Sequence, residues 1–341
     1  DMMKLSRLML AAVAVCGTSA VMAQSSVTIY GRVNTTVEHQ KLGDNKATGV
    51  ANNNSRIGFK GVEDLGNGLK AGFQLEAGFG SDDGSGPLTF KRQSEVNLSG
   101  NFGMVRLGNF YPESYYATSD YIGMHNHETG SSSDVLYYDA AWNGNGTGNK
   151  VAYRTPTFNN FWAEASVSLH EKANNPVVKV NKNAYDLAAN YNNGPLSLGA
   201  GYSYWNSNYQ AALRGLYTFG QFTVGAYYQR NKDDNAILGA GAGTRNNFRL
   251  SGMYVLNASE FHVNVGRANS WSKVDDSAAT QWTLGYNYNL SKRTKVYTYY
   301  TKVNNGKNAS YGYATRDENN NVIRANGLNT SSFAVGVRHN F

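Results

Sequence analysis

The sequence has a single cysteine in 341 residues, Cys16, so a fold held together by internal disulfides is excluded. Proline is also scarce, with five residues, and all of them lie in predicted connections or at a strand end. After the first two dozen residues no run of 18 apolar residues occurs, which argues against a membrane protein built from helices. Glycine and tyrosine are abundant instead, with 37 and 24 residues, and mean hydropathy is −0.49. An all-β protein with half-apolar strands fits this composition, whether it is soluble or a transmembrane barrel.

The first 23 residues have the pattern of an export signal. Lys4 and Arg7 precede a short apolar stretch at 8–16, and small residues follow up to Ala23. A basic start, a short apolar centre and a small-residue end are typical of a secretory signal peptide, so we expect cleavage after Ala23. Lipid attachment at Cys16 is the alternative, but Val15 stands where a small residue is expected before such a cysteine. The mature chain, 24–341, is predicted to form one domain.

From Ser26 onward, apolar and polar residues alternate with the period of two that is typical of β-strands, and no convincing helical period occurs. Short connections such as "NNGP" alternate with long polar ones, of which 206–209 is unusually short. Sixteen strands are predicted, at 26–38, 55–63, 68–80, 89–100, 103–109, 149–156, 160–170, 183–192, 195–205, 210–219, 221–231, 246–256, 260–270, 279–289, 294–304 and 331–341.

Short turns on one side and long loops on the other describe an up-and-down antiparallel sheet. An open sheet of this size would expose its edges, and closure into a barrel removes them. An even number of strands places both chain ends on the short-turn side. We therefore predict an all-β fold, a 16-stranded antiparallel barrel.

The polarity of the two strand faces indicates which solvent surrounds the barrel. In the strand at 68–80, Phe73 and Leu75 fall on one face, and Gln74 and Glu76 on the other. A sixteen-stranded barrel is too wide for its interior to be filled by apolar side chains, so the apolar faces are predicted to meet lipid and the polar faces to line a wet lumen. Tyrosines near strand ends fit an interfacial girdle. A soluble sandwich with its apolar faces inside is the alternative.

Several ordered stretches resemble one family. "SSVTIYGRV", "SRIGFKGVEDLGNGLKAGFQLE", "FKRQSEVNLSGNFGMVRLGNF", "NLSKRT" and "VGVRHNF" are similar to the general diffusion porins of Gram-negative bacteria, in the branch typical of β-proteobacteria. The resemblance implies an outer-membrane homotrimer of sixteen-stranded barrels, each narrowed by an infolded third loop. The alternating last strand and its terminal Phe341 resemble the signal that is read by the barrel assembly machinery.

Strand parity predicts a basic wall inside the barrel. Outward-facing apolar neighbours place Arg32, Arg56, Lys60, Arg106 and Arg154 on the inner face. Lys91 joins them if the register set by Val96 and Leu98 extends that far, whereas Arg92 does so only through a bulge, although the resemblance implies a wall arginine in this stretch. Each residue alone could be an ordinary solvated lumen residue, but a cluster of one sign in a cleft focuses the electric field. Such clusters commonly set anion preference. Arg214 and Arg338 are predicted to face inward as well.

The stretch 110–148 is too long for a plain connection and is rich in acids and tyrosines. The resemblance implies that it is a constriction loop whose carboxylates face the basic wall. Glu113 and Asp120 are the predicted constriction acids. An exposed acidic loop is the alternative, and packing on the wall explains the tyrosines better than a sugar track does.

The function predicted from these features is a general diffusion porin with weak to moderate anion preference. A substrate-selective channel for an oligosaccharide or an organic anion is the alternative, and a barrel hydrolase is a second one, although no Ser/His/Asp set has convincing spacing. His125 and His127 have H-x-H spacing with Glu128 beside them, but no partner motif completes a metal site. We predict no cofactor, no metal and no nucleic-acid partner; the expected partners are membrane lipids, the assembly machinery and permeating ions and solutes.

Overall fold

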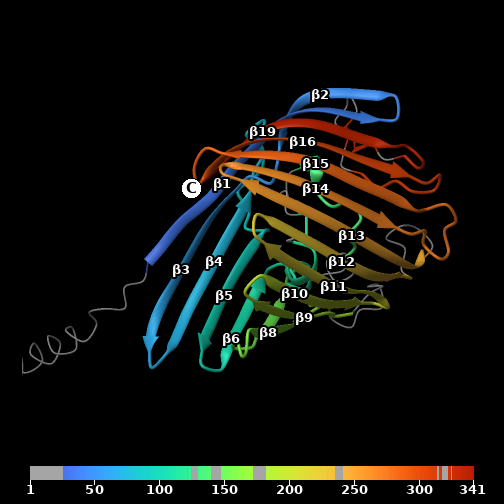
Figure 1. The fold of residues 1–341 in the computed structure, drawn as a ribbon. Coiled ribbons are helices and arrows are strands. Elements are labelled where there is room, and N and C mark those ends of the chain that lie inside the picture. The colour runs from blue at the N-terminus through green and yellow to red at the C-terminus, as the bar shows by residue number, and fades with distance from the viewer. Residues whose placement is uncertain are drawn as a thin grey trace, which may run out of the picture.

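The computed structural model describes residues 26–120, 122–123, 130–139, 147–171, 182–234, 241–312, 315–316, 322–323 and 325–341. Almost all regular structure in these ranges is β-strand, and the strands stand side by side around one axis (Figure 1). Among the residues described, no helix is long and apolar enough to cross a membrane. The strands are β1 Ser26–Leu42, β2 Asn45–Asn52, β3 Arg56–Gly66, β4 Leu69–Gly78, β5 Gln93–Gly100, β6 Gly103–Asn109, β7 Lys150–Arg154, β8 Phe161–Ser168, β9 Ala184–Asn193, β10 Leu196–Trp205, β11 Asn208–Phe219, β12 Phe222–Asp233, β13 Gly243–Leu256, β14 Ser259–Ala268, β15 Ala279–Asn289, β16 Thr294–Asn305, β17 Thr315–Arg316, β18 Val322–Ile323 and β19 Thr330–Asn340.

The main sheet closes on itself. Each strand is antiparallel to its neighbours, and the first strand, in blue, lies beside the last, in red (Figure 1). β2 and β3 both pair with β1, β3 along its first part and β2 along its second, so the two together take one place in the barrel. Counted in this way over the described residues, the sheet has sixteen strand positions, which confirms the predicted barrel. The separate pair β17–β18 lies outside this sheet.

Two predicted strand boundaries were wrong. The stretch 39–54 was assigned to a loop, but β1 runs on to Leu42 and β2 returns along it. The strand predicted at 89–100 begins only at Gln93, and Phe90 instead packs edge-on against Phe59 with ring centroids 6.4 Å apart. All the other predicted strands are present, with shifts of a few residues at their ends.

The short connections use residues that tolerate left-handed backbone. Between β3 and β4, Gly66, Asn67 and Gly68 all have positive φ, at 86°, 52° and 78°. This tight turn suits the twist of an antiparallel hairpin. The described chain begins and ends on this same short-turn side, because Ser26 pairs with Val62 near this turn and Asn340 N–H donates to the carbonyl of Arg293 in the short connection between β15 and β16.

The described part of the long connection between β6 and β7 contains two short helices, α2 Glu113–Thr118 and η1 Gly130–Ser132. Pro112 precedes the first turn of α2, and Asp186 on β9 accepts a hydrogen bond from Ser114 N at 3.1 Å. A strand of the barrel therefore provides the cap that the helix lacks in its own sequence.

Candidate functional site: the inner wall and the loop against it

The two faces of the strands differ as the alternation predicts. On β14, the outward Phe261, Val263 and Val265 are exposed, while His262 and Asn264 between them are buried. The same contrast recurs around the barrel, so the outer face is apolar and the inner face is polar. Apolar side chains left exposed on a closed barrel are stable only where lipid covers them.

The first group of inner basic residues surrounds Glu76 on β4. Arg92 donates from Nε to Glu76 Oε1 at 2.7 Å, and Arg56 Nη1 lies 3.7 Å from the same oxygen. Arg32 donates from Nε to the carbonyl of Asn54 at 3.1 Å, and Arg56 donates to this carbonyl at the same distance. Three predicted wall residues thus meet at one place, on β1, on β3 and just before β5.

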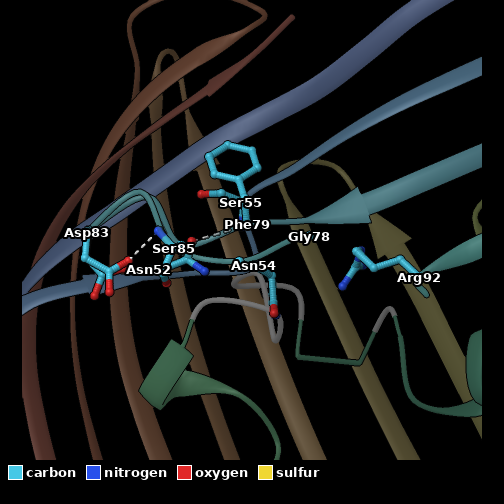
Figure 2. Close-up of a pocket in the computed structure, with 11 residues that line it drawn as sticks. Asn52, Asn54, Ser55, Gly78, Phe79, Asp83, Ser85 and Arg92 are labelled. Carbon is cyan, nitrogen blue, oxygen red and sulfur yellow. Dashed lines mark hydrogen bonds between the residues drawn. The ribbon is translucent and has the colours of Figure 1, made fainter. Parts of the chain in front are cut away.

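A cavity of about 570 Å³ lies beside this group. Asn52, Asn54 and Ser55 line it together with the base of the β4–β5 connection. Figure 2 shows Arg92 at one end and Asp83 at the other, where Asp83 Oδ1 accepts a hydrogen bond from Ser85 N at 2.8 Å. Hydrogen bonds from Ser85 lower the pKa of Asp83, which keeps this carboxylate charged.

The second group is buried more deeply. Arg106 on β6 donates from Nε to Glu95 at 2.6 Å and from Nη1 to Glu164 at 2.9 Å. Arg154 on β7 donates to the same Glu164 at 3.0 Å and to Glu113 of α2 at 3.0 Å. Arg106 and Arg154 are therefore joined through Glu164 into one network that ends on the loop.

Two predicted wall residues lie apart from these groups. Lys60 is exposed, with its Nζ 5.1 Å from the centre of the Tyr30 ring. Lys91 is exposed too, and the register argument that placed it on the inner wall fails because β5 begins after it. Its neighbour Arg92 takes the inward position without any bulge in a strand.

The long connection lies against the inner face of the barrel. α2 packs on β9, β10 and β11. A Cβ atom added at Gly199 on β10 would lie 1.9 Å from the carbonyl oxygen of Ala117, so only glycine permits this approach. Further along the loop, Gln229 donates to the carbonyl of Tyr138 at 2.7 Å and accepts from its N–H at 3.1 Å.

One ion pair anchors the second half of the loop. Arg249 on β13 donates to Asp134 from Nη2 at 2.7 Å and from Nε at 3.0 Å. Burial alone would raise the pKa of Asp134, but the guanidinium and a hydrogen bond from Tyr227 hold it below its usual range. Arg245, on the same strand, donates to the carbonyl of Leu136 at 2.7 Å.

The two predicted constriction acids have different positions. Glu113 is buried and contacts Arg154 directly, whereas Asp120 is only partly exposed at the end of the α2 segment and also has interaction partners. Burial raises the pKa of Glu113 to about 8, against the opposing effect of Arg154. His125, His127 and Glu128 lie outside the described residues. Within the described ranges, no group of three or more His, Cys, Asp or Glu side chains could hold a metal.

Sequence reasoning missed several members of this site. Arg245 and Arg249 have the inward parity that Phe248 and Leu250 define, so the signal that found the other arginines was present for them. Lys295 on β16 is partly buried opposite the predicted Arg338, and its Nζ lies 4.0 Å from a carboxylate oxygen of Glu260. Arg214, which the sequence analysis did predict to face inward, is buried and donates to Ser197 Oγ at 2.9 Å.

Phe341 lies at the seam where the barrel closes. Its N–H donates to the carbonyl of Gly31 at 3.0 Å, and Gly31 N–H donates back at 3.1 Å. Its ring covers Gly31, where an added Cβ would lie 2.6 Å from Phe341 Cζ. The last residue therefore completes the pairing of the last strand with the first.

A family model described as Gram-negative porin matches residues 10–308. The chain belongs to this family. It is accordingly an outer-membrane channel of a Gram-negative bacterium, not an enzyme. Outer membrane porin protein 32 of Delftia acidovorans is 33% identical and covers 99% of this chain and 100% of its own length. An outer membrane porin protein of Bordetella pertussis is 27% identical with the same coverage. These relatives confirm the resemblance to porins of β-proteobacteria.

Solved structures agree with the fold. One titled as an anion-selective porin from Comamonas acidovorans is 30% identical, covers 93% of this porin and 100% of its own chain, and superimposes with a TM-score of 0.75. OmpT of Vibrio cholerae in a form titled as a trimer is 16% identical and covers 93% of this porin and 99% of its own chain, with a TM-score of 0.65. The second likeness concerns the fold alone.

Proposed function

We propose that this porin is a general diffusion channel for ions and small hydrophilic solutes, with a weak to moderate preference for anions. The observation that carries the proposal is an imbalance of exposure within the wall ion pairs. The side chains of Arg56 and Arg92 are 15% and 18% exposed, against 11% for their partner Glu76. Arg154 is 31% exposed, against 9% for Glu113 and 2% for Glu164.

This imbalance means that water in the lumen meets guanidinium groups more than it meets carboxylates. At an effective dielectric constant near 20, one unit charge about 6 Å away contributes roughly 3 kcal/mol before salt screens it. Even a small excess of cationic surface would therefore favour anions, and the preference should fade as salt rises. The relative titled as anion-selective supports the same direction.

Reversal potentials in planar bilayers under a salt gradient test the proposal. Replacing Arg56 and Arg92 together by glutamine should move the reversal potential toward cations, because Glu76 then loses two cationic neighbours. Lys46 and Lys307 are matched controls, since both are exposed and lie away from this group. Cation selectivity of the unmodified channel, or equal shifts from the two pairs of variants, would contradict the proposal.

A substrate-selective channel is the second candidate. Tyrosines 111, 115 and 116 of the loop form a contiguous aromatic group with ring centroids 5.4–6.3 Å apart, a surface on which sugars or aromatic solutes can stack. Liposome swelling with neutral sugars and with charged solutes of equal size separates the two functions. A general channel should discriminate by size and only weakly by charge.

We also propose that three copies associate in the membrane. The connection 80–87 supports this, because its exposed residues project from a base where Ser81 Oγ hydrogen-bonds Thr35 Oγ1 at 2.7 Å. Such a rigid projection is suited to contact a neighbouring copy. Unheated gels after mild extraction should show a heat-labile trimer, and a monomer alone would contradict this proposal.

The chain ends carry two further proposals. We propose that residues 1–23 are removed during export. The mass of the protein isolated from the membrane tests this. We propose that Phe341 is read by the assembly machinery, so that deleting it should slow assembly in cells more than it slows refolding in detergent.

A further inference from the structure

The outer wall has an apolar depression where β9, β10, β11 and β12 lie side by side. Its volume is about 540 Å³, and most of its lining is hydrocarbon. Ala189 and Ala200 are paired across β9 and β10, and Ala211 on β11 is paired with the bulkier Tyr202. Leu213 is 62% exposed, so this lining faces away from the lumen. The shape and chemistry suit a hydrocarbon chain.

A cation stands at the edge of this depression. Arg230 on β12 has the same outward parity as Tyr228, and it belongs to the lining. Its Nη1 donates to Asn246 Oδ1 at 2.9 Å, and Tyr228 OH donates to the same oxygen at 2.9 Å. Across the described part of the chain, the Arg230 guanidinium makes no ion pair. The nearby Lys232 is paired with Asp234 at 3.0 Å, so that pair adds no net charge.

The depth of Arg230 in the membrane follows from the topology. β12 runs from the short connection after Phe219 to the long connection after Asp233, and the long connections of porin barrels are extracellular. One row nearer that end, Tyr185, Tyr204 and Tyr209 are cross-strand neighbours, as in an interfacial tyrosine belt. Arg230 therefore lies at the headgroup level of the outer leaflet, where a lipid-facing cation is tolerated.

We propose that this depression, which we call the β9–β12 groove, binds lipopolysaccharide of the outer leaflet, with an acyl chain along the alanines and a phosphate on Arg230. A guanidinium with open donors next to an apolar groove matches a ligand that joins a phosphate to hydrocarbon chains. The strands of the groove lie five to eight positions beyond β4 in the sheet order, away from the connection 80–87, so the proposed contact between copies leaves the groove open. The inference does not depend on the ion preference of the lumen.

Binding measurements on the full chain, refolded in detergent free of lipopolysaccharide, test the proposal. The probes are lipopolysaccharide with a short core, the same molecule after removal of its phosphates, and phosphatidylglycerol. Arg230→Gln should weaken binding of the first probe by about tenfold or more, the effect of one charge-assisted contact. Arg267→Gln is the matched control, because Arg267 has an outward position as well and donates to Thr280 Oγ1 at 3.1 Å, but does not line the groove. It should bind like the unmodified porin.

Three further readouts complete the test. Ala200→Leu with Ala211→Leu fills the groove and should also weaken binding about tenfold. Arg230→Lys keeps the charge and should retain most of the binding. If Arg230→Gln does not refold, the groove-filling variant and the dephosphorylated probe carry the test. Conductance should be unchanged in all of these variants, since the residues face away from the lumen. Three results would overturn the proposal. The first is that Arg230→Gln binds lipopolysaccharide as well as the unmodified porin does. The second is that the porin binds the dephosphorylated probe or phosphatidylglycerol as well as it binds lipopolysaccharide, and the third is that trimers associate through the groove and the same variants abolish that association.

Discussion

Arg154 on the barrel wall donates to Glu113 in the first turn of α2 across 3.0 Å, and this contact joins the loop to the wall network. Burial raises the pKa of Glu113 to about 8, well above the value of about 4.3 for a free glutamate. Between these two pKa values, Glu113 is protonated in the docked loop and ionised in a detached loop. Between these two pKa values, docking is therefore strongest at low pH and weakens as pH rises.

Current noise measured from pH 5 to pH 9 checks this relationship. Noise should increase with pH in the unmodified channel as the loop becomes less firmly docked. Glu113→Gln keeps an oxygen for Arg154 but cannot titrate, so its noise should rise less over this range than that of the unmodified channel. Glu171→Gln, at an exposed position on another connection, is the control and should behave like the unmodified channel.

Asp134 should show the opposite dependence. Its pKa lies below the usual range because of Arg249, so its contribution to docking is complete above about pH 4 and is lost as pH falls further. Asp134→Asn should loosen the loop already at neutral pH, by about 3–5 kcal/mol for a buried pair that loses one partner. Channels with larger conductance and more noise at pH 7 are the expected result. A variant that matches the unmodified channel at pH 7 would mean that the pair does not hold the loop.

The strands could be predicted because their signal is local. A residue's face depends only on whether its position is odd or even within the strand, so Arg56, Arg106 and Arg154 could be placed on the inner wall one by one. β2 was not predicted because nearly all its side chains are exposed on a projecting hairpin, so its sequence shows no alternation of apolar and polar residues. The register argument for Lys91 failed because the strand that carried the alternation starts two residues later.

The pairing of these residues could not be predicted in the same way. Glu164 lies directly opposite Arg154, but Arg106 reaches Glu164 diagonally, which depends on the register between strands. Asp134 and Arg249 are 115 positions apart, and nothing local in the sequence connects them. The sequence therefore predicted the arginines as a basic wall. It identified the carboxylates only as polar residues of the inner face and did not predict that they partly neutralise the wall.

The fit of α2 on β10 predicts a strong effect of a single methyl group. Gly199→Ala would place a Cβ atom 1.9 Å from the Ala117 carbonyl oxygen, so the helix must move away from the wall. Barrel folding should persist, because the strand pairing of Gly199 does not involve the loop. We expect changed conductance with unchanged heat-modifiable mobility on gels. Gly215→Ala is the control, since its nearest atom would be a leucine methyl at an ordinary 3.7 Å.

Replacing Arg106 tests whether the wall network stabilises the barrel or only lines the lumen. Its guanidinium serves both Glu95 and Glu164 and stacks on Phe110 at 3.9 Å from the ring centre. Arg106→Gln leaves two carboxylates buried with less compensation, so the free energy of unfolding should fall by about 3–5 kcal/mol. The midpoint of guanidinium unfolding for the refolded protein measures this. Adding Glu95→Gln should restore part of the loss, because coupled neighbours do not act additively. If the double variant is no more stable than Arg106→Gln alone, the two groups are not coupled, and the stabilising role of the network is refuted.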